Sequence, residues 1–163
     1  MFRVAIALII GLVILQVPII AQDQLPASVI PNCTNLKVKG KRVSTRRLQY
    51  VVPKNVVVKK VRDIDYGEYR VLLKEQGRWE SLHLFSLGNG TPYSVCSAAH
   101  SRTLQLPDGT TGRDARCRKG DNQESRSTGF SSEFAFYDSV SAESARSFDR
   151  IIDSMCYARG KNQ

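Results

Sequence analysis

The chain has 163 residues, of which 24 are lysine or arginine and 15 are acidic, giving a formal net charge of +9 at pH 7. Its length fits one typical domain and leaves little room for a second compact one. The four cysteines form no close Cys-x-x-Cys pair, which excludes the usual zinc motifs, and we expect neither a metal nor a cofactor.

The N-terminal segment predicts a secretory signal peptide over residues 1–21. An uncharged, almost wholly apolar run follows Arg3 and extends from Val4 to Ala21. A membrane anchor is the alternative, because about 18 apolar residues approach the length that spans a bilayer. Pro18 and the polar residues after the run favour cleavage after Ala21 or Gln22. We therefore expect residues 22–163 to form a single secreted, extracellular domain without stable membrane insertion.

The next segment is strongly basic. Between Gln24 and Arg62 there is no acidic residue. A field of one sign attracts polyanions such as RNA or an acidic membrane surface. The alternative is a solvated basic face that only keeps the protein soluble. Lys54 is also one of the ten cations of this segment. The candidate RNA-binding residues are Lys37, Lys39, Lys41, Arg42, Arg46, Arg47, Lys59, Lys60 and Arg62.

The expected elements begin with a short helix over residues 43–52, which Ser44 would cap and Pro53 would end. The β-branched run 56–61 predicts a strand. Residues 66–73 and 79–87 alternate as two further strands, and the glycine-containing segment 74–77 joins them as a hairpin. Residues 93–97 are a candidate for one more strand.

The pattern weakens over residues 97–146. A small hairpin is expected around Pro107-Asp108-Gly109. We interpret much of the serine-rich segment 125–147 as loop, with one buried segment that contains Phe134, Phe136 and Tyr137. The apolar residues from Ala145 to Met155 recur at helical spacing, and Ser141 or Ser144 would cap such a helix. The β-branched pair Ile151-Ile152 is the argument for a strand instead.

An even number of cysteines behind a signal peptide predicts two disulfides. Three pairings are open, and we favour the nested one, Cys33 with Cys156 and Cys96 with Cys117. On the loop-entropy model the outer bridge stabilises by roughly 4 to 5 kcal/mol and the inner one by about 3. The triplets that begin at Asn32 and Asn89 match the acceptor pattern for N-glycosylation.

Several motifs, in order, resemble the fungal guanyl-specific ribonucleases, and more closely the secreted ribonuclease-like effector candidates of powdery mildew fungi. The motifs are Cys33 with Val43-Ser44-Thr45, the aromatic segment 65–69, the segment 79–94, Phe148-Asp149-Arg150-Ile151-Ile152, and Cys156. The resemblance implies an α+β fold in which one helix packs on a small antiparallel sheet, with residues 97–146 as an inserted loop region. It also implies that residues 148–152 form a strand and that Cys156 pairs with Cys33.

The chemistry of that family needs a base, an acid and a cation beside the phosphate. By resemblance, Glu80 is the base and Arg150 binds phosphate; the alternative is a salt bridge or plain exposure. The family's acid is a histidine beyond the arginine strand, where this chain has none. The two histidines are His83 and His100. On a regular strand His83 would face away from Glu80, because side chains alternate.

The missing acid points to binding without catalysis. The leading hypothesis is a secreted, non-catalytic ribonuclease-like effector that binds host RNA or host protein, with delivery into a host cell open. One alternative is an active guanyl-preferring endoribonuclease. The other is a secreted, disulfide-bonded recognition protein unrelated to ribonucleases.

Overall fold

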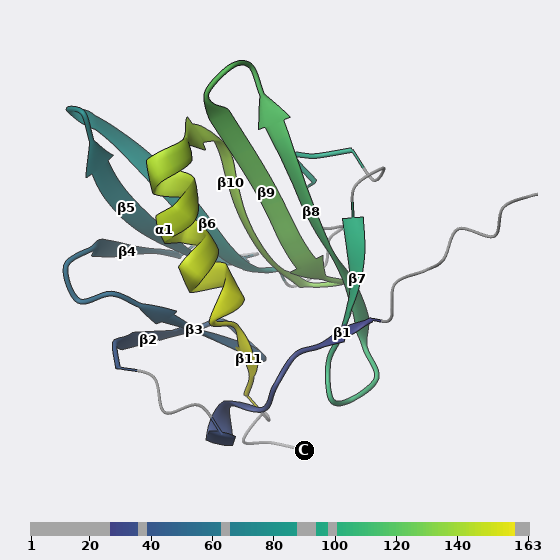
Figure 1. Ribbon diagram of the computed structural model, residues 1–163. Helices are drawn as coiled ribbons and strands as arrows, with labels where there is room; N and C mark the ends of the chain where they lie inside the picture. The colour runs from purple at the N-terminus through teal and green to yellow at the C-terminus, as the bar shows by residue number, and fades with distance from the viewer. Residues whose placement is uncertain (1–26, 36–38, 63–65, 88–93, 98–100, 159–163) are drawn as a thin grey trace, which may run out of the picture.

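The computed structural model describes residues 27–35, 39–62, 66–87, 94–97 and 101–158. Two β-sheets and one α-helix, α1, make up its body (Figure 1). The predicted signal peptide lies outside the described residues. Among the described residues, no helix combines the length and the apolar character that crossing a membrane requires.

The larger sheet has eight strands in the order β1-β7-β8-β9-β10-β6-β5-β4. They are β1 (Ser28–Val29), β4 (Val57–Arg62), β5 (Tyr66–Glu75), β6 (Arg78–Leu87), β7 (Ser101–Gln105), β8 (Thr111–Lys119), β9 (Gln123–Phe130) and β10 (Glu133–Ser141). Only the β1–β7 pair is parallel; the other neighbours are antiparallel. The sheet is therefore mixed, and most of it is a meander.

The smaller sheet has three strands in the order β11-β3-β2. They are β2 (Lys41–Ser44), β3 (Leu48–Val52) and β11 (Cys156–Tyr157). A short 3-10 helix, η1 (Cys33–Asn35), precedes this sheet, and α1 (Ala142–Asp153) runs from the end of β10 to the start of β11. The expected architecture of one helix on a small ribonuclease-like sheet is wrong, because the larger sheet spans eight strands.

The helix predicted over residues 43–52 is wrong, because this segment belongs to the hairpin of β2 and β3. Leu48, Tyr50 and Val52 are all buried, whereas Gln49 and Val51 between them are only half-buried. Burial therefore follows the period of two that a strand requires. The prediction relied on apolar residues three and four positions apart and did not weigh Tyr50 as a buried residue.

The hairpin predicted between residues 66–73 and 79–87 is confirmed. β5 and β6 pair in register from Tyr66 opposite Leu87 to Glu75 opposite Arg78. Gln76 and Gly77 turn the chain with φ angles of 47° and 82°. Positive φ at both central residues matches the twist of the flanking strands, and glycine adopts it without strain. The strand predicted over residues 56–61 is also present, as β4.

Residues 97–146 are not an inserted loop. They contain β7, β8, β9 and β10, which together form half of the larger sheet. The turn predicted at Pro107-Asp108-Gly109 joins β7 to β8, with the Gly109 amide donating to the Leu106 carbonyl at 2.9 Å. The serine-rich segment expected to be loop forms most of β9, all of β10 and the first turns of α1. Small polar residues are tolerated there because the neighbouring strands satisfy the backbone.

The helical period near the C-terminus is confirmed, and the strand implied by the family resemblance is wrong. Ser141 caps α1, and its hydroxyl accepts a hydrogen bond from the Ser144 amide. Phe148, Ile151 and Ile152 are buried on one side of the helix. Tyr137 of β10 contacts Phe148, with ring centroids 5.7 Å apart. We call the side of the larger sheet that α1 covers the inner face, and the opposite side the outer face.

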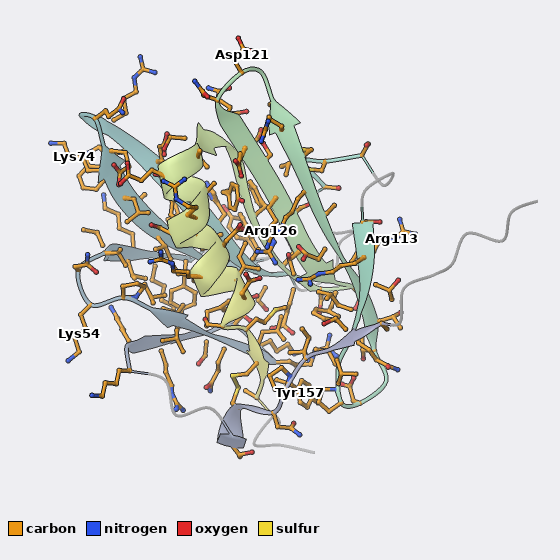
Figure 2. All side chains as sticks on the ribbon, in the orientation of Figure 1. Lys54, Lys74, Arg113, Asp121, Arg126 and Tyr157 are labelled. Carbon is orange, nitrogen blue, oxygen red and sulfur yellow. A yellow bond between two sulfur atoms is a disulfide. The ribbon has the colours of Figure 1, made fainter. Side chains whose placement is uncertain are left out.

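A buried arginine holds α1 to the inner face (Figure 2). The Arg126 side chain is 1% exposed and donates two hydrogen bonds to Asp114, at 2.7 and 2.9 Å. It also donates to Asp149 and Asp153 of α1, at 2.8 and 2.7 Å. Burial alone would raise the pKa of Asp114, but the hydrogen bonds and charge of Arg126 outweigh it, so this pKa lies below its usual value. The network connects β8, β9 and α1.

Both disulfides of the nested pairing are present, Cys33–Cys156 and Cys96–Cys117. The first joins η1 to β11, beside a backbone bridge between Asn32 and Tyr157. The second joins the segment 94–97 to β8 across the outer face. The two bridges are compatible with a secreted protein.

Candidate functional site

The Glu80 side chain is hydrogen-bonded to the first residues of α1 and does not line an open site. Its carboxylate accepts hydrogen bonds from the Ser141 amide at 3.0 Å and from the Ser141 hydroxyl at 2.9 Å. Burial would raise the pKa of Glu80, but the hydrogen bonds from the serines at the helix start outweigh it and the pKa is lowered. A carboxylate beside a helix N-terminus is stabilising. Glu80 is therefore placed as a capping group.

Arg150 lies on α1 and does not meet Glu80. It is exposed, nine residues beyond Ser141 along the helix. At 1.5 Å per residue, this separates it from the helix start by about 13 Å. The structure does not bring together the two residues predicted to be catalytic.

His83 projects from the face opposite Glu80, as strand alternation predicts. Leu82 and Leu84 beside it are fully buried on the inner face, whereas His83 contacts groups of the outer face. His100, the other histidine, lies outside the described residues.

A buried glutamate on β5 organises the surroundings of His83. Glu68 has a side chain only 1% exposed and accepts two hydrogen bonds from Arg70, at 2.7 and 3.1 Å. Its Oε1 also lies 2.6 Å from His83 Nδ1. Burial would raise the pKa of Glu68, but the hydrogen bonds from Arg70 and His83 outweigh it and the pKa is lowered. The carboxylate is therefore held in its ionised form.

The second ring nitrogen of His83 contacts a serine on the same strand. His83 Nε2 lies 2.8 Å from the hydroxyl oxygen of Ser81, two residues earlier. A separation of two places both side chains on one face of β6. Glu68, His83 and Ser81 thus form a continuous hydrogen-bonded chain, which we call the outer polar chain. Sequence reasoning did not find it, because its members come from two strands whose register only the fold defines.

Aromatic rings continue the outer face from His83 towards β10. His83 stacks on Phe136 with centroids 4.8 Å apart and planes at 5°. Phe85 stacks on Phe134 at 4.9 Å and 11°. Both are direct cross-strand neighbours of β6 and β10, where aromatic pairs stabilise a sheet. The His83 ring is therefore fixed in place by stacking as well as by hydrogen bonds.

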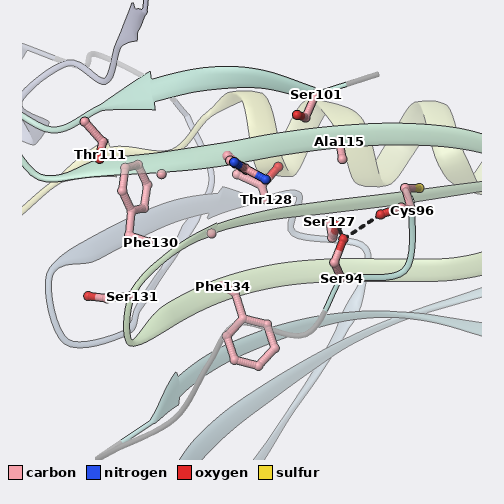
Figure 3. Close-up of a pocket in the computed structure, with 13 residues that line it drawn as sticks. Ser94, Cys96, Ser101, Thr111, Ala115, Ser127, Thr128, Phe130, Ser131 and Phe134 are labelled. Carbon is pink, nitrogen blue, oxygen red and sulfur yellow. Dashed lines mark hydrogen bonds between the residues drawn. The ribbon is translucent and has the colours of Figure 1, made fainter. Parts of the chain in front are cut away.

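A pocket of about 500 Å³ lies beside this aromatic row (Figure 3). Its lining includes the small residues Ala115, Ser127 and Gly129, with Phe134 at one side. A Cβ at Gly129 would lie 2.6 Å from Phe134 Cβ, so a glycine is required for this close approach. Ser94 lies above the strands, where its hydroxyl donates to the Cys96 carbonyl at 2.7 Å. The described lining is mostly apolar, with scattered hydroxyl groups and Arg113.

The predicted RNA-binding residues mostly lie on two end strands and the adjoining turns. β4 ends the larger sheet and β2 ends the smaller one, and Figure 1 shows both on the same side of the molecule. We call the exposed cations of this region the basic edge: Lys39, Lys41, Arg42, Arg46, Lys54, Lys59 and Lys60. Lys37 and the side chain of Arg62 lie outside what the structure describes.

Arg47 differs from its neighbours because acidic groups engage it. Its Nε donates to the buried Glu133 at 3.0 Å, and its guanidinium lies 3.6 Å from Asp108. Arg47 thus joins the smaller sheet to β10 and to the turn after β7, and we do not count it in the basic edge. Lys60, by contrast, has its ammonium 5.2 Å from the Tyr69 ring centroid and remains exposed.

Most acidic side chains in the described part of the chain are engaged internally. Hydrogen bonds or ion pairs to other residues occupy Glu68, Glu80, Asp108, Asp114, Glu133, Asp138, Asp149 and Asp153. Their charge is therefore largely neutralised by internal partners. The surplus of positive charge is left at the surface, and the basic edge concentrates it.

The predicted glycosylation site at Asn32 is exposed, next to Cys33, whereas Asn89 lies outside the described residues. The described residues contain no group of three or more histidine, cysteine or acidic side chains arranged to hold a metal ion.

The predicted family relationship was compared with known proteins. No protein-family model, curated protein or solved structure matches the chain. The resemblance to guanyl-specific ribonucleases therefore stays a prediction from the motifs alone.

Proposed function

We propose that the mature protein is secreted and binds a polyanion, RNA in the first instance, on the basic edge without cleaving it. The observation that carries this proposal is the contrast between paired carboxylates and a concentrated run of exposed cations. Internal partners occupy most of the described carboxylates, whereas residues 39–62 contain cations and no acid. Phosphate contacts with released counterions supply most of the free energy of such binding.

The arrangement of the basic edge supports an extended ligand. Lys41 and Arg42 lie on β2, and Lys59 and Lys60 lie on β4, with Lys54 in the turn between β3 and β4. Lysines on end strands also prevent edge-to-edge pairing of sheets. That role needs only a few charges and does not account for cations in the turns as well.

The positions and hydrogen bonds of the candidate catalytic groups favour binding without cleavage. Glu80 accepts both hydrogen bonds from Ser141, and Arg150 lies at the other end of α1. The two ring nitrogens of His83 are engaged by Glu68 and Ser81. The base, the phosphate-binding cation and the histidine therefore do not share one site, as RNA cleavage by this chemistry would require.

The test is fluorescence anisotropy of a labelled single-stranded RNA with the mature protein, between about 50 and about 200 mM salt. Each phosphate contact contributes roughly 0.7 to the slope of log affinity against log salt for single strands. We expect the triple variant Lys41→Glu/Lys59→Glu/Lys60→Glu to bind weakly and to reduce the slope by about 2.

A matched control makes the same change in net charge at three cations outside the basic edge. The triple variant Arg113→Glu/Arg118→Glu/Arg146→Glu changes three exposed cations outside the basic edge, and we expect most of the affinity to remain. Equal losses in both variants would show attraction to net charge alone and contradict the proposed surface. The RNA is also analysed on a denaturing gel, where cleavage that disappears in His83→Gln would support a nuclease instead.

A further inference from the structure

The hydrogens of the outer polar chain can be assigned from the chemistry of its members. Glu68 is ionised and can only accept hydrogen bonds, so His83 Nδ1 carries the hydrogen of their 2.6 Å contact. In the neutral imidazole Nε2 then has a free lone pair. The contact of 2.8 Å between Nε2 and Ser81 therefore runs from the serine hydroxyl to the ring. With the neutral ring in this tautomer, the proton of Ser81 points at a base.

The chain has fixed geometry from end to end. Arg70 holds Glu68 with two hydrogen bonds, Glu68 holds the Nδ1 side of the ring, and Phe136 stacks on the ring plane. Both contacts of His83 fall within the distances seen when a base activates a nucleophile and a third group orients the base. If Glu68 served only to stabilise the sheet, its pairing with Arg70 would be enough, and a contact between His83 and Ser81 would not be needed.

Exposure distinguishes the two ends of the chain. Glu68 has a side chain 1% exposed, whereas that of His83 is 22% exposed and Ser81 is half-buried. A carboxylate sealed at one end and a hydroxyl that solvent can reach at the other fit the order of base and nucleophile. From this geometry we infer that Ser81 is an activated nucleophile towards small activated esters, with His83 as its base and Glu68 as a positioning residue.

The reaction is acyl transfer. As the Ser81 oxygen attacks the ester carbonyl carbon, its proton passes to His83 Nε2. The bond from that carbon to the leaving oxygen breaks, and the leaving group takes the proton from His83 and departs as an alcohol. Water then gives a proton to His83 and attacks the acyl carbon. The bond to the Ser81 oxygen breaks, that oxygen regains the proton from His83, and a carboxylic acid is released.

The neighbours of Ser81 indicate the acyl group it would take. Leu72 lies directly opposite on β5, and Trp79 is two residues away on the same face of β6. Trp79 is 59% exposed, with the Lys74 ammonium 6.0 Å from its ring centroid. An apolar or aromatic acyl group would lie on these two side chains. The substrate class is therefore an ester of a small aromatic or aliphatic acid with a good leaving group.

The test uses the mature protein with both disulfides intact and an alkyl fluorophosphonate probe, which phosphonylates activated serines and releases fluoride. Intact mass followed by peptide mapping should show one adduct, on Ser81. The labelling rate should fall as the pH is lowered, because protonated His83 no longer accepts the serine hydrogen. Hydrolysis of an aryl acetate should follow the same profile.

Two serines on one strand provide the matched control. Ser81→Ala should abolish the adduct, whereas Ser86→Ala, also on β6, should label at the wild-type rate. Glu68→Gln should slow labelling by about 100-fold or more and change the pH profile, and Glu68→Asp should restore part of the rate. Circular dichroism identifies any variant that does not fold.

The wild-type measurement keeps the test decisive even if a variant misfolds. If Ser81 stays unmodified under conditions that fully label a known serine hydrolase, or if it labels no faster than Ser86, the inference is wrong. RNA binding is not involved, so this result and the test of the basic edge succeed or fail separately.

Discussion

Arg126 on the inner face and Arg70 on the outer face each donate two hydrogen bonds to a buried carboxylate, yet their side chains are 1% and 46% exposed. Arg126 is surrounded by Asp114, Asp149 and Asp153. Arg102 and Arg116 also pair with these carboxylates, so three cations face three anions within the network. The chain that begins at Arg70 instead continues through His83 to a reachable hydroxyl. The same pair of groups thus stabilises the fold on one face and prepares chemistry on the other.

The two disulfides extend this comparison and carry the largest expected effects. Cys33–Cys156 closes a loop with a sequence separation of 123, and Cys96–Cys117 one of 21. The loop-entropy model gives roughly 5 kcal/mol for the first and about 3 for the second. We expect Cys33→Ser/Cys156→Ser to destabilise more than Cys96→Ser/Cys117→Ser in urea unfolding. The reverse order would mean that the outer face depends on its bridge more than loop length implies.

The two arginines are the direct test of the comparison. Arg126→Met removes the buried partner of Asp114 and leaves it only the half-exposed Arg102 and the Thr128 hydroxyl, which should lower the free energy of unfolding by about 3 to 5 kcal/mol. Arg70→Met should cost about 1 kcal/mol, because water can replace an exposed guanidinium and His83 still donates to Glu68. Denaturant unfolding of both variants measures this difference. Equal losses would show that the outer carboxylate is as dependent on its arginine as the inner one.

Acid should weaken the inner face through Asp114. Its folded-state pKa lies below the unfolded value of about 3.9. The contribution to stability is therefore complete above about pH 4 and is lost as the pH falls through the folded pKa. Unfolding followed from about pH 6 down to about pH 2 should show this loss, and Asp114→Asn should have a shallower dependence. An unchanged slope would place the acid sensitivity in other carboxylates.

The smallest expected effects concern two buried tyrosines. The Tyr50 hydroxyl is buried without a hydrogen-bond partner among the described residues, and burial raises its pKa. Tyr50→Phe should be neutral or stabilise by up to about 1 kcal/mol. Tyr137→Phe, the control, removes a hydroxyl that donates to Asp149 at 3.0 Å and should cost about 1 kcal/mol. Thermal unfolding of the pair measures the difference.

Local patterns predicted several elements correctly. The β5–β6 hairpin followed from alternation on both sides of a glycine turn, and α1 from apolar residues at helical spacing behind Ser141. The helix predicted over residues 43–52 failed because two apolar periods overlap there. Much of β9 and β10 was expected to be loop because serine is typical of turns, and pairing with neighbouring strands determined their conformation.

The candidate sites divide in the same way. The excess of cations over residues 39–62 could be predicted from the composition. Strand alternation also predicted that Glu80 and His83 project from opposite faces of β6. The outer polar chain could not be predicted, because no sequence pattern over a few residues relates Glu68 to a histidine fifteen residues later. Only the register that sets Arg70 opposite His83 brings them together.

The sequence by itself determined the net charge, the basic edge, the terminal helix and the hairpin turns, because each depends on residues close together in the chain. Tertiary structure decided which carboxylates are neutralised, which face of the sheet α1 covers and where the hydrogen of Ser81 is directed. Those features depend on groups from separate strands meeting within hydrogen-bond distance. Strand order and register set such distances, and short-range preferences do not specify them.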